Sequence, residues 1–191
     1  IPGSTTAALN EAVNITVTNN VTFAQAKIID DGSNSGSNTY NISDSAANLA
    51  AGIVTSVTAI NGAGTVTSTT ATAAQGATLA SISQAIVYNI SDTAANIVAN
   101  VGGLNETVDI TSTVATFAQA KIIEDATNSG TITYNISDTA ANLAAGIGTD
   151  SVAITSSGTV TASTSATAAE ANIIAGLSKV VTYSISDNAV N

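Results

Sequence analysis

Recurring aspartates are the residues of this chain whose type and spacing come closest to catalytic chemistry. Each follows a Tyr-x-Ile-Ser motif, and the four are Asp44, Asp92, Asp138 and Asp187. Acid–base or nucleophilic catalysis needs a positioned base, nucleophile or metal, and the sequence has no His and no Cys. A catalytic carboxylate is expected once, whereas these recur in every repeat. We therefore expect a structural role, with Ser43 or Asp44 capping a helix, and we expect neither enzymatic activity nor a cofactor.

Calcium is the one metal that the sequence makes worth testing. Asp30 and Asp31, and 94 residues later Glu124 and Asp125, lie in corresponding acidic loops, each followed by an asparagine. Oxygen ligands are what calcium requires, but the spacing is not that of an EF-hand loop. A weak calcium site and a solvated acidic turn both remain possible at this stage.

Glycosylation is a second candidate modification of the surface. Six Asn-x-Ser/Thr triplets occur, at Asn14, Asn20, Asn41, Asn89, Asn105 and Asn135. Such asparagines can carry sugar where the host has the transferase, although a chain rich in Asn, Ser and Thr produces these triplets by chance. The rival interpretation is a polar ladder, in which Asn41, Asn89 and Asn135 stack across adjacent turns and pair their amides.

These residues belong to a tandem repeat. The motif Tyr-Asn-Ile-Ser-Asp-Ser-Ala-Ala-Asn at 40–48 returns at 88–96, at 134–142 and, less faithfully, at 183–191. The tyrosines are 48, 46 and 49 positions apart, and a period in this range indicates supersecondary units stacked along one axis. Function should therefore follow from how the units stack.

Each repeat contains signals for two helices and a strand. Thr-x-x-Gln/Glu at Thr22, Thr72, Thr116 and Thr167 has the spacing of a capping box and predicts four short helices. In 39–43 the alternation places Tyr40 and Ile42 on one face of a strand. A second helix is expected over 46–51, with Gly52 and Gly146 as C-terminal stops.

Odd and even repeats differ, because Phe23–Ile29 matches 117–123 at a separation of 94 and the intervening copies lack the Phe. Asn-Gly and Ser-Gly in the segments 56–68 and 151–163 separate alternating runs, which predicts a hairpin and one extra strand. The chain then divides into a first double repeat at 10–104 and a second at 105–191. We expect the second to be completed by residues 1–9 of the same or the next copy.

Composition narrows the possible functions. Charged residues make up 8% of the chain and the net charge is −10, with three lysines as the only cations, so phosphate backbones and anionic lipid surfaces would be repelled. We expect no nucleic-acid partner and, without a long apolar run, no membrane insertion. The absence of Cys, Met, Trp and His removes the most easily oxidised side chains, which suits a durable extracellular material.

The Tyr-x-Ile-Ser-Asp-Thr-Ala-Ala-Asn motif, followed by a β run and a Thr-x-x-Gln helix, resembles the repeats of very large secreted or surface-attached bacterial proteins of the adhesin and repeat-in-toxin type. The similarity covers essentially the whole chain. It implies export, a location at the cell surface or in the biofilm matrix, and a structural or adhesive role. The Gly-Gly-x-Gly-x-Asp nonapeptide is absent, so the resemblance does not extend to a calcium β-roll.

The sequence thus predicts a mixed α/β tandem repeat, solenoid-like, with an all-β sandwich or β-solenoid as the alternative. The predicted function is that of a structural protein in an extracellular filament, which assembles as a head-to-tail homopolymer or continues as a longer repeat chain. The competing hypothesis is the repetitive stalk of an adhesin that binds glycan or another cell.

Overall fold

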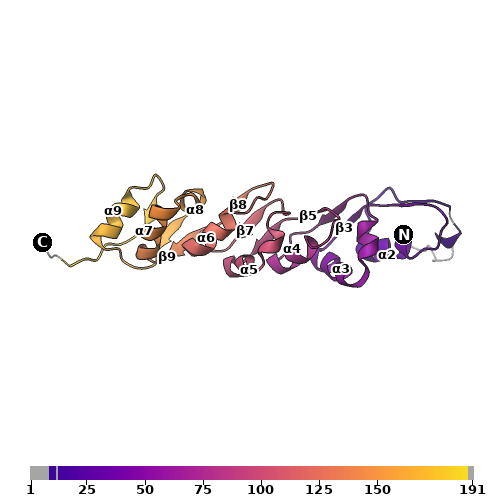
Figure 1. Ribbon diagram of the computed structural model, residues 1–191, viewed down its shortest axis with the longest axis horizontal. Helices are drawn as coiled ribbons and strands as arrows, with labels where there is room; N and C mark the ends of the chain where they lie inside the picture. The colour runs from indigo at the N-terminus through magenta and orange to yellow at the C-terminus, as the bar shows by residue number, and fades with distance from the viewer. Residues whose placement is uncertain (1–8, 12, 189–191) are drawn as a thin grey trace.

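The protein is a rod with its two ends far apart, as the computed structural model in Figure 1 shows. The structure describes residues 9–11 and 13–188. Colour runs without interruption from indigo at one end of the rod to yellow at the other, so neighbours in sequence are neighbours along the axis. The predicted joining of residues 1–9 to the C-terminal residues lies mostly outside the described part of the chain.

Short helices alternate with short strands along this rod. The helices are α2 (Phe23–Asp30), α3 (Ala46–Asn61), α4 (Ala73–Leu79), α5 (Ala94–Ala99), the 3-10 helix η1 (Val101–Gly103), α6 (Phe117–Glu124), α7 (Ala140–Thr149), α8 (Val152–Ser156) and α9 (Ala168–Ala175). The strands are β1 (Ile15–Thr16), β2 (Asn38–Thr39), β3 (Ile42–Asp44), β4 (Val66–Ser68), β5 (Ile86–Val87), β6 (Ile90–Asp92), β7 (Ile110–Ser112), β8 (Ile132–Thr133), β9 (Ile136–Asp138), β10 (Val160–Ala162) and β11 (Val181–Thr182). The mixed α/β class is confirmed, and the all-β alternative is wrong.

All strand pairs in the described residues are parallel. They form four small sheets, in the orders β1-β2, β3-β4-β5, β6-β7-β8 and β9-β10-β11. Consecutive sheets are linked because one extended segment carries a strand of each; segment 38–44, for example, contains β2 and β3. Segments that already pair through their strands are also joined by single parallel bridges, such as that of Ala71 to Ile90. Paired residues lie from 19 positions apart, as in that bridge, to 24 apart, as in Ile42 and Val66.

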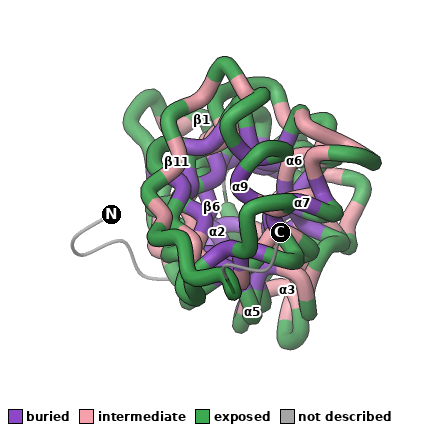
Figure 2. The backbone as a smooth tube through the Cα atoms, turned by 90° about the vertical axis from the view of Figure 1, so that its left-hand side faces the viewer, coloured by how far each residue is buried: buried purple, intermediate pink, exposed green. Residues whose placement is uncertain are grey.

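The core runs along the inside of the rod. Viewed from the C-terminal end, buried backbone lies in the interior and exposed backbone surrounds it (Figure 2). Its largest fully buried side chains are two tyrosines and a series of isoleucines and leucines, among them Tyr40, Ile42, Ile90, Tyr134 and Ile136. The predicted inward face of Tyr40 and Ile42 is thereby confirmed.

The four predicted capping boxes are present. In α2 the Thr22 hydroxyl accepts from the backbone N–H of Gln25, and the Gln25 side chain accepts from the backbone N–H of Thr22. The same reciprocal pair opens the other three helices of this series, α4, α6 and α9. A helix of seven or eight residues gains little from propensity, so these caps and the packing against neighbouring helices stabilise it.

The two predicted hairpins do not form. Residues 56–61 complete α3, which bends at Ser56, and residues 152–156 are α8, while the strands after them, β4 and β10, pair in parallel with other segments. In the first of these segments Ala59 and Ile60 are fully buried, which an alternating strand would not permit. Tertiary packing here outweighs the local turn signal.

Gly52 and Gly146 do not end their helices as predicted; they lie inside α3 and α7. A Cβ at Gly52 would lie 2.7 Å from Cε2 of Phe23, and one at Gly146 would lie 2.6 Å from Cζ of Phe117. The glycines therefore make room for the phenyl rings of the preceding helices. This contact explains why Phe and Gly recur together at a separation of 94 residues.

Candidate functional site

The recurring aspartates join two helix starts. Asp138 Oδ2 accepts from the N–H of Phe117 at 2.9 Å, the first residue of α6, and its Oδ1 accepts from the N–H of Thr139 at 2.8 Å and from Asn142 Nδ2 at 2.7 Å. Since α6 and α7 lie on successive segments, one carboxylate ties the start of one helix to the start of the next. It also complements the positive ends of both helices.

The residue that caps each of these helices is the one that follows the aspartate, and not the aspartate itself as predicted. The N-cap residues are Ser45, Thr93 and Thr139, whose hydroxyls accept from the amide three positions on, so Ser43 and Asp44 are not the caps. Asp44 and Asp92 repeat the contacts of Asp138, and Asp187 accepts from the N–H of Ala168. Burial disfavours the charge of Asp92, but hydrogen bonds from Asn96, Ala73 and Thr93 outweigh it and lower the pKa of that carboxyl.

The tyrosines of the motif fix the helices from inside the rod. Tyr40 donates to the carbonyl of Ala59 at 2.8 Å, Tyr134 donates to that of Ala153 at 2.7 Å, and Tyr88 lies 2.9 Å from the carbonyl of Gly103. All three rings are 1–2% exposed. Each buried hydroxyl therefore satisfies a carbonyl near the end of the helical segment that follows it.

Burial of these phenols opposes their ionisation. Desolvation, together with the nearby carboxylates of Asp30 and Glu106, raises the pKa of Tyr40 and of Tyr88 to about 12, from an ordinary value of 10.0. Their stabilising contribution is fully present below pH 10 and is lost as the pH rises toward 12.

We expect the free energy of unfolding to fall steeply between about pH 10 and 12, measured by urea denaturation with circular dichroism. The matched variant Tyr40→Phe keeps the ring and removes the ionisable group, so its stability should fall less over the same range. Equal slopes for both proteins would contradict the assignment.

The predicted asparagine ladder is wrong in its partners. Asn41, Asn89 and Asn135 do not bond one another, and each side-chain oxygen accepts from a backbone N–H of the next segment. The donors are Thr65 at 2.9 Å, Asp109 at 3.1 Å and Thr159 at 2.8 Å. Motif copies lie two segments apart, so their asparagines cannot be neighbours.

Two more of the candidate glycosylation residues make the same kind of contact. Asn14 accepts from the N–H of Ser37 and Asn105 from that of Thr127. Asn20 is exposed. The side-chain oxygens of the five bonded asparagines are thus engaged in joining segments.

The candidate calcium ligands bond elsewhere. Asp31 pairs with Lys27 at 2.6 Å, the Thr58 hydroxyl donates to Asp30, and Glu124 Oε2 lies 2.9 Å from the Tyr134 hydroxyl oxygen. Within residues 9–11 and 13–188, no group of three or more His, Cys, Asp or Glu side chains has the arrangement of a metal site.

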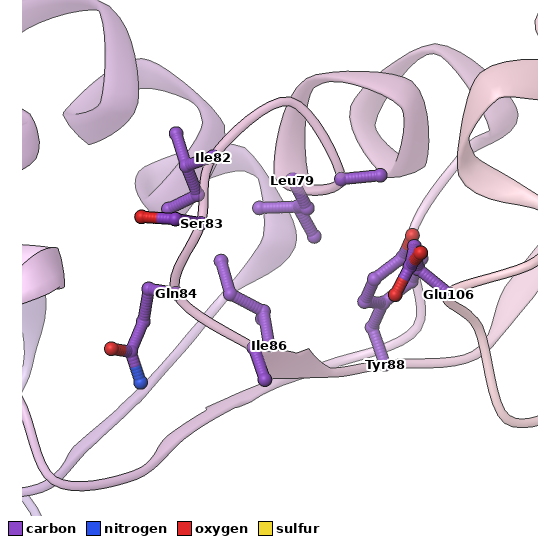
Figure 3. A pocket seen from close by; sticks show the side chains of 9 residues that line it. Leu79, Ile82, Ser83, Gln84, Ile86, Tyr88 and Glu106 are labelled. Atoms are coloured by element: carbon purple, nitrogen blue, oxygen red, sulfur yellow. The ribbon is translucent and has the colours of Figure 1, made fainter.

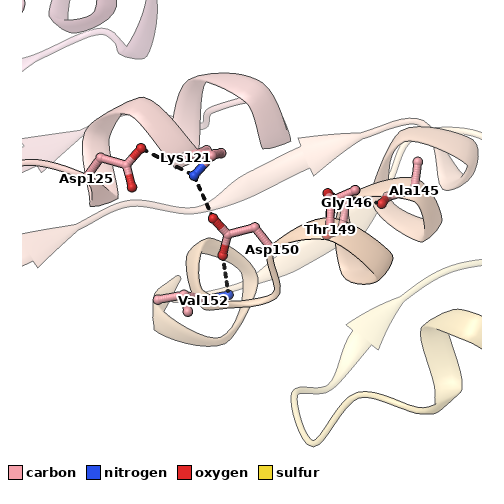
Figure 4. A network of polar contacts seen from close by, with 7 residues as sticks. All are labelled: Lys121, Asp125, Ala145, Gly146, Thr149, Asp150 and Val152. Carbon is pink, nitrogen blue, oxygen red and sulfur yellow. Dashed lines mark hydrogen bonds and ion pairs between the residues drawn. The ribbon is translucent and has the colours of Figure 1, made fainter.

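The fourth candidate, Asp125, belongs to a small ionic network on the surface. Lys121 Nζ lies 3.3 Å from Asp125 and 2.6 Å from Asp150, which in turn accepts from the N–H of Val152 (Figure 4). Hydrogen bonds to the two carboxylates raise the pKa of Lys121, and Lys121 lowers that of Asp150. The network links α6 to the turn between α7 and α8, and being solvent-exposed it contributes modestly to stability.

Hollows on the surface follow the repeat. Two of about 240 and 310 Å³ have the same seven lining residue types 94 positions apart, around Phe23 with Gly52 and around Phe117 with Gly146. A third, of about 230 Å³, has Tyr88 and Glu106 among its lining residues (Figure 3). The carboxylates that line the first two hollows, Asp44 and Asp138, are the ones that bond the starts of two helices.

One recurring hydrogen bond, from a helix start to a threonine hydroxyl, was not predicted from the sequence. The hydroxyls of Thr69, Thr113 and Thr164 accept from the first helical N–H of the preceding segment, at Ala46, Ala94 and Ala140. A Ser-Thr pair recurs at these places, at 68–69, 112–113 and 163–164, and that repetition was the available signal.

The C-terminal end of the parallel ladder exposes side chains whose equivalents are buried elsewhere in the rod. Ile185 at the C-terminal end is 60% exposed, whereas its equivalents Ile42, Ile90 and Ile136 are at most 1% exposed. Tyr183 is only partly buried, unlike the other three tyrosines. The last described segment therefore presents an apolar strand edge.

Comparisons with protein-family models, with curated proteins and with solved structures found no match. None of the helices described is long and apolar enough to cross a membrane. The function must therefore be argued from the geometry of this chain.

Proposed function

We propose that this chain is a structural element of an extracellular filament or surface matrix. Its solenoid-like stack of strand–helix units continues end to end with further copies of itself. The observation that carries the proposal is the parallel ladder, in which every internal segment is bonded on both sides and the outermost described segments on one. Such a heterologous contact repeats without closing, so it generates a fibre and not a ring.

The other contacts support a mechanical role. Aspartate, tyrosine, asparagine and threonine side chains, which elsewhere could bind ligands, each join successive segments here. The polar groups of the motif thus hold successive segments together along the axis. The absence of Cys, Met, Trp and His agrees with an exposed material that resists oxidation.

Electron microscopy of the purified 191-residue chain tests the proposal. We expect fibres of uniform width that lengthen as the protein concentration rises, with a mass by light scattering that rises in parallel. Separate rods of one length at every concentration would contradict the filament and favour the stalk of an adhesin that binds glycan or another cell. Surface labelling of producing cells would test the extracellular location.

A further inference from the structure

Resting on the proposed function, we propose a specific contact between copies. The exposed edge of segment 181–186 pairs in parallel with segment 13–18 of a second copy, and Ile185 lies opposite Ile15. The occupant of the open edge is thus another molecule of this chain, bound head to tail in a defined register.

The register follows from the internal ladder. Three times along the rod the isoleucine of the Tyr-x-Ile motif has a Cα partner in the next segment: Ile42 with Val66, Ile90 with Ile110, and Ile136 with Val160. Ile185 is the fourth isoleucine of this series. Ile15 occupies the partner position, because it pairs with Asn38 just as Val66 pairs with Ile86.

Backbone groups at the two edges are complementary in this register. In the internal copy around Tyr134, Ile136 N–H donates to the Thr159 carbonyl and Gly158 N–H donates to the Tyr134 carbonyl. The equivalent pairs between copies are Ile185 N–H with the Asn14 carbonyl, and Val13 N–H with the Tyr183 carbonyl. These four groups have no backbone partner within the described residues.

Apolar burial favours the same contact. Ile185 and the ring of Tyr183 would gain the cover that their internal equivalents have. Ile15 is already buried, at 7% exposure, and would gain a second neighbouring strand as Val66 has. Other occupants would need the same parallel strand with an isoleucine or valine at that place. A second copy supplies both.

One residue at this edge departs from the series. Ser184 occupies the position at which Asn41, Asn89 and Asn135 accept a hydrogen bond from the next segment. The contact between copies therefore lacks one hydrogen bond that the contacts within the chain have. Ser184→Asn should restore it, with Asn14 N–H as the donor. We expect the concentration needed for assembly to fall about five-fold, the effect of one ordinary hydrogen bond.

Engineered cysteines test the register, because the chain has none of its own. Internal pairs such as Ser137 with Thr161 are Cα partners, and the equivalents between copies are Ser186 and Thr16. Variants Ser186→Cys and Thr16→Cys, mixed and oxidised mildly, should give a disulfide-linked heterodimer on a non-reducing gel. Ser137→Cys with Thr161→Cys in one chain is the positive control, and Ser186→Cys mixed with Thr18→Cys is two positions out of register.

The outcomes separate the two proposals. Linkage of the in-register mixture, with little in the out-of-register mixture, supports the inferred contact. Fibres that form while the out-of-register mixture links equally, or while Ser186→Cys links to itself, overturn the register and leave the filament standing. Rods that stay separate with no linkage overturn both.

Discussion

Gly103→Ala should destabilise the protein by about 3 kcal/mol, at the upper end of the cost of overpacking a close contact. A Cβ at this position would lie 2.4 Å from the carbonyl carbon of Gly76 and 2.6 Å from the backbone nitrogen of Ala77. These are backbone atoms of α4, which cannot rotate aside as a side chain would. The helix would have to move, and the Tyr88 hydroxyl that bonds the carbonyls of both glycines would lose its geometry.

The neighbouring residue provides a matched control. A Cβ at Gly102 meets nothing within 4 Å, so Gly102→Ala should change stability by no more than about 1 kcal/mol and in the stabilising direction, because alanine restricts the unfolded chain. Urea denaturation of the two variants measures the difference. Similar stability of both would show that α4 and η1 are not in close contact.

Tyr134→Ala should cost about 2 to 5 kcal/mol, since it removes a fully buried ring and leaves a cavity between segments. Ile136→Ala should cost a similar amount, because that side chain is 1% exposed on the same face. Both losses are far above the effect of an average surface substitution.

Tyr134→Phe separates the ring from its hydroxyl. The phenylalanine keeps the packing but leaves the Ala153 carbonyl without its donor, so about 1 to 3 kcal/mol should be lost. An exposed residue of the same strand region, Thr133, gives the control Thr133→Ala, which should be nearly neutral. Thermal melting would refute the assignment of this face to the core if Tyr134→Ala melted like the control.

Local signals in the sequence predicted the parts of the fold that depend on near neighbours. Thr22 and Gln25 are three residues apart, so the capping box could be recognised in the sequence without knowing what the helix packs against. Tyr40 and Ile42 alternate in the same way with polar residues. Such features are decided within a few positions of the chain.

The predicted hairpins do not form because tertiary packing outweighs the local turn signal in these segments. Asn61-Gly62 has the composition of a hairpin turn. Ala59 and Ile60 just before it are nevertheless fully buried, and the Ala59 carbonyl accepts a hydrogen bond from the Tyr40 hydroxyl. Gly52 was misread for a related reason: its conformational freedom is not used, and only its lack of a side chain beside Phe23 matters.

The polar connections could not be assigned because their partners are about twenty residues away. Asp138 is adjacent to its predicted helix, yet its other oxygen bonds Phe117, on the preceding segment. The sequence showed that these residues recur and are structural. Which segment each side chain bonds depends on the spacing between segments, and no short motif contains that spacing.

The short reach of the ladder also bears on how such a chain is made. Each extended segment finds its strand partners only 19 to 24 residues away, so no contact of the ladder must wait for a distant part of the polypeptide. Folding of this kind can begin at any segment and advance from one segment to the next.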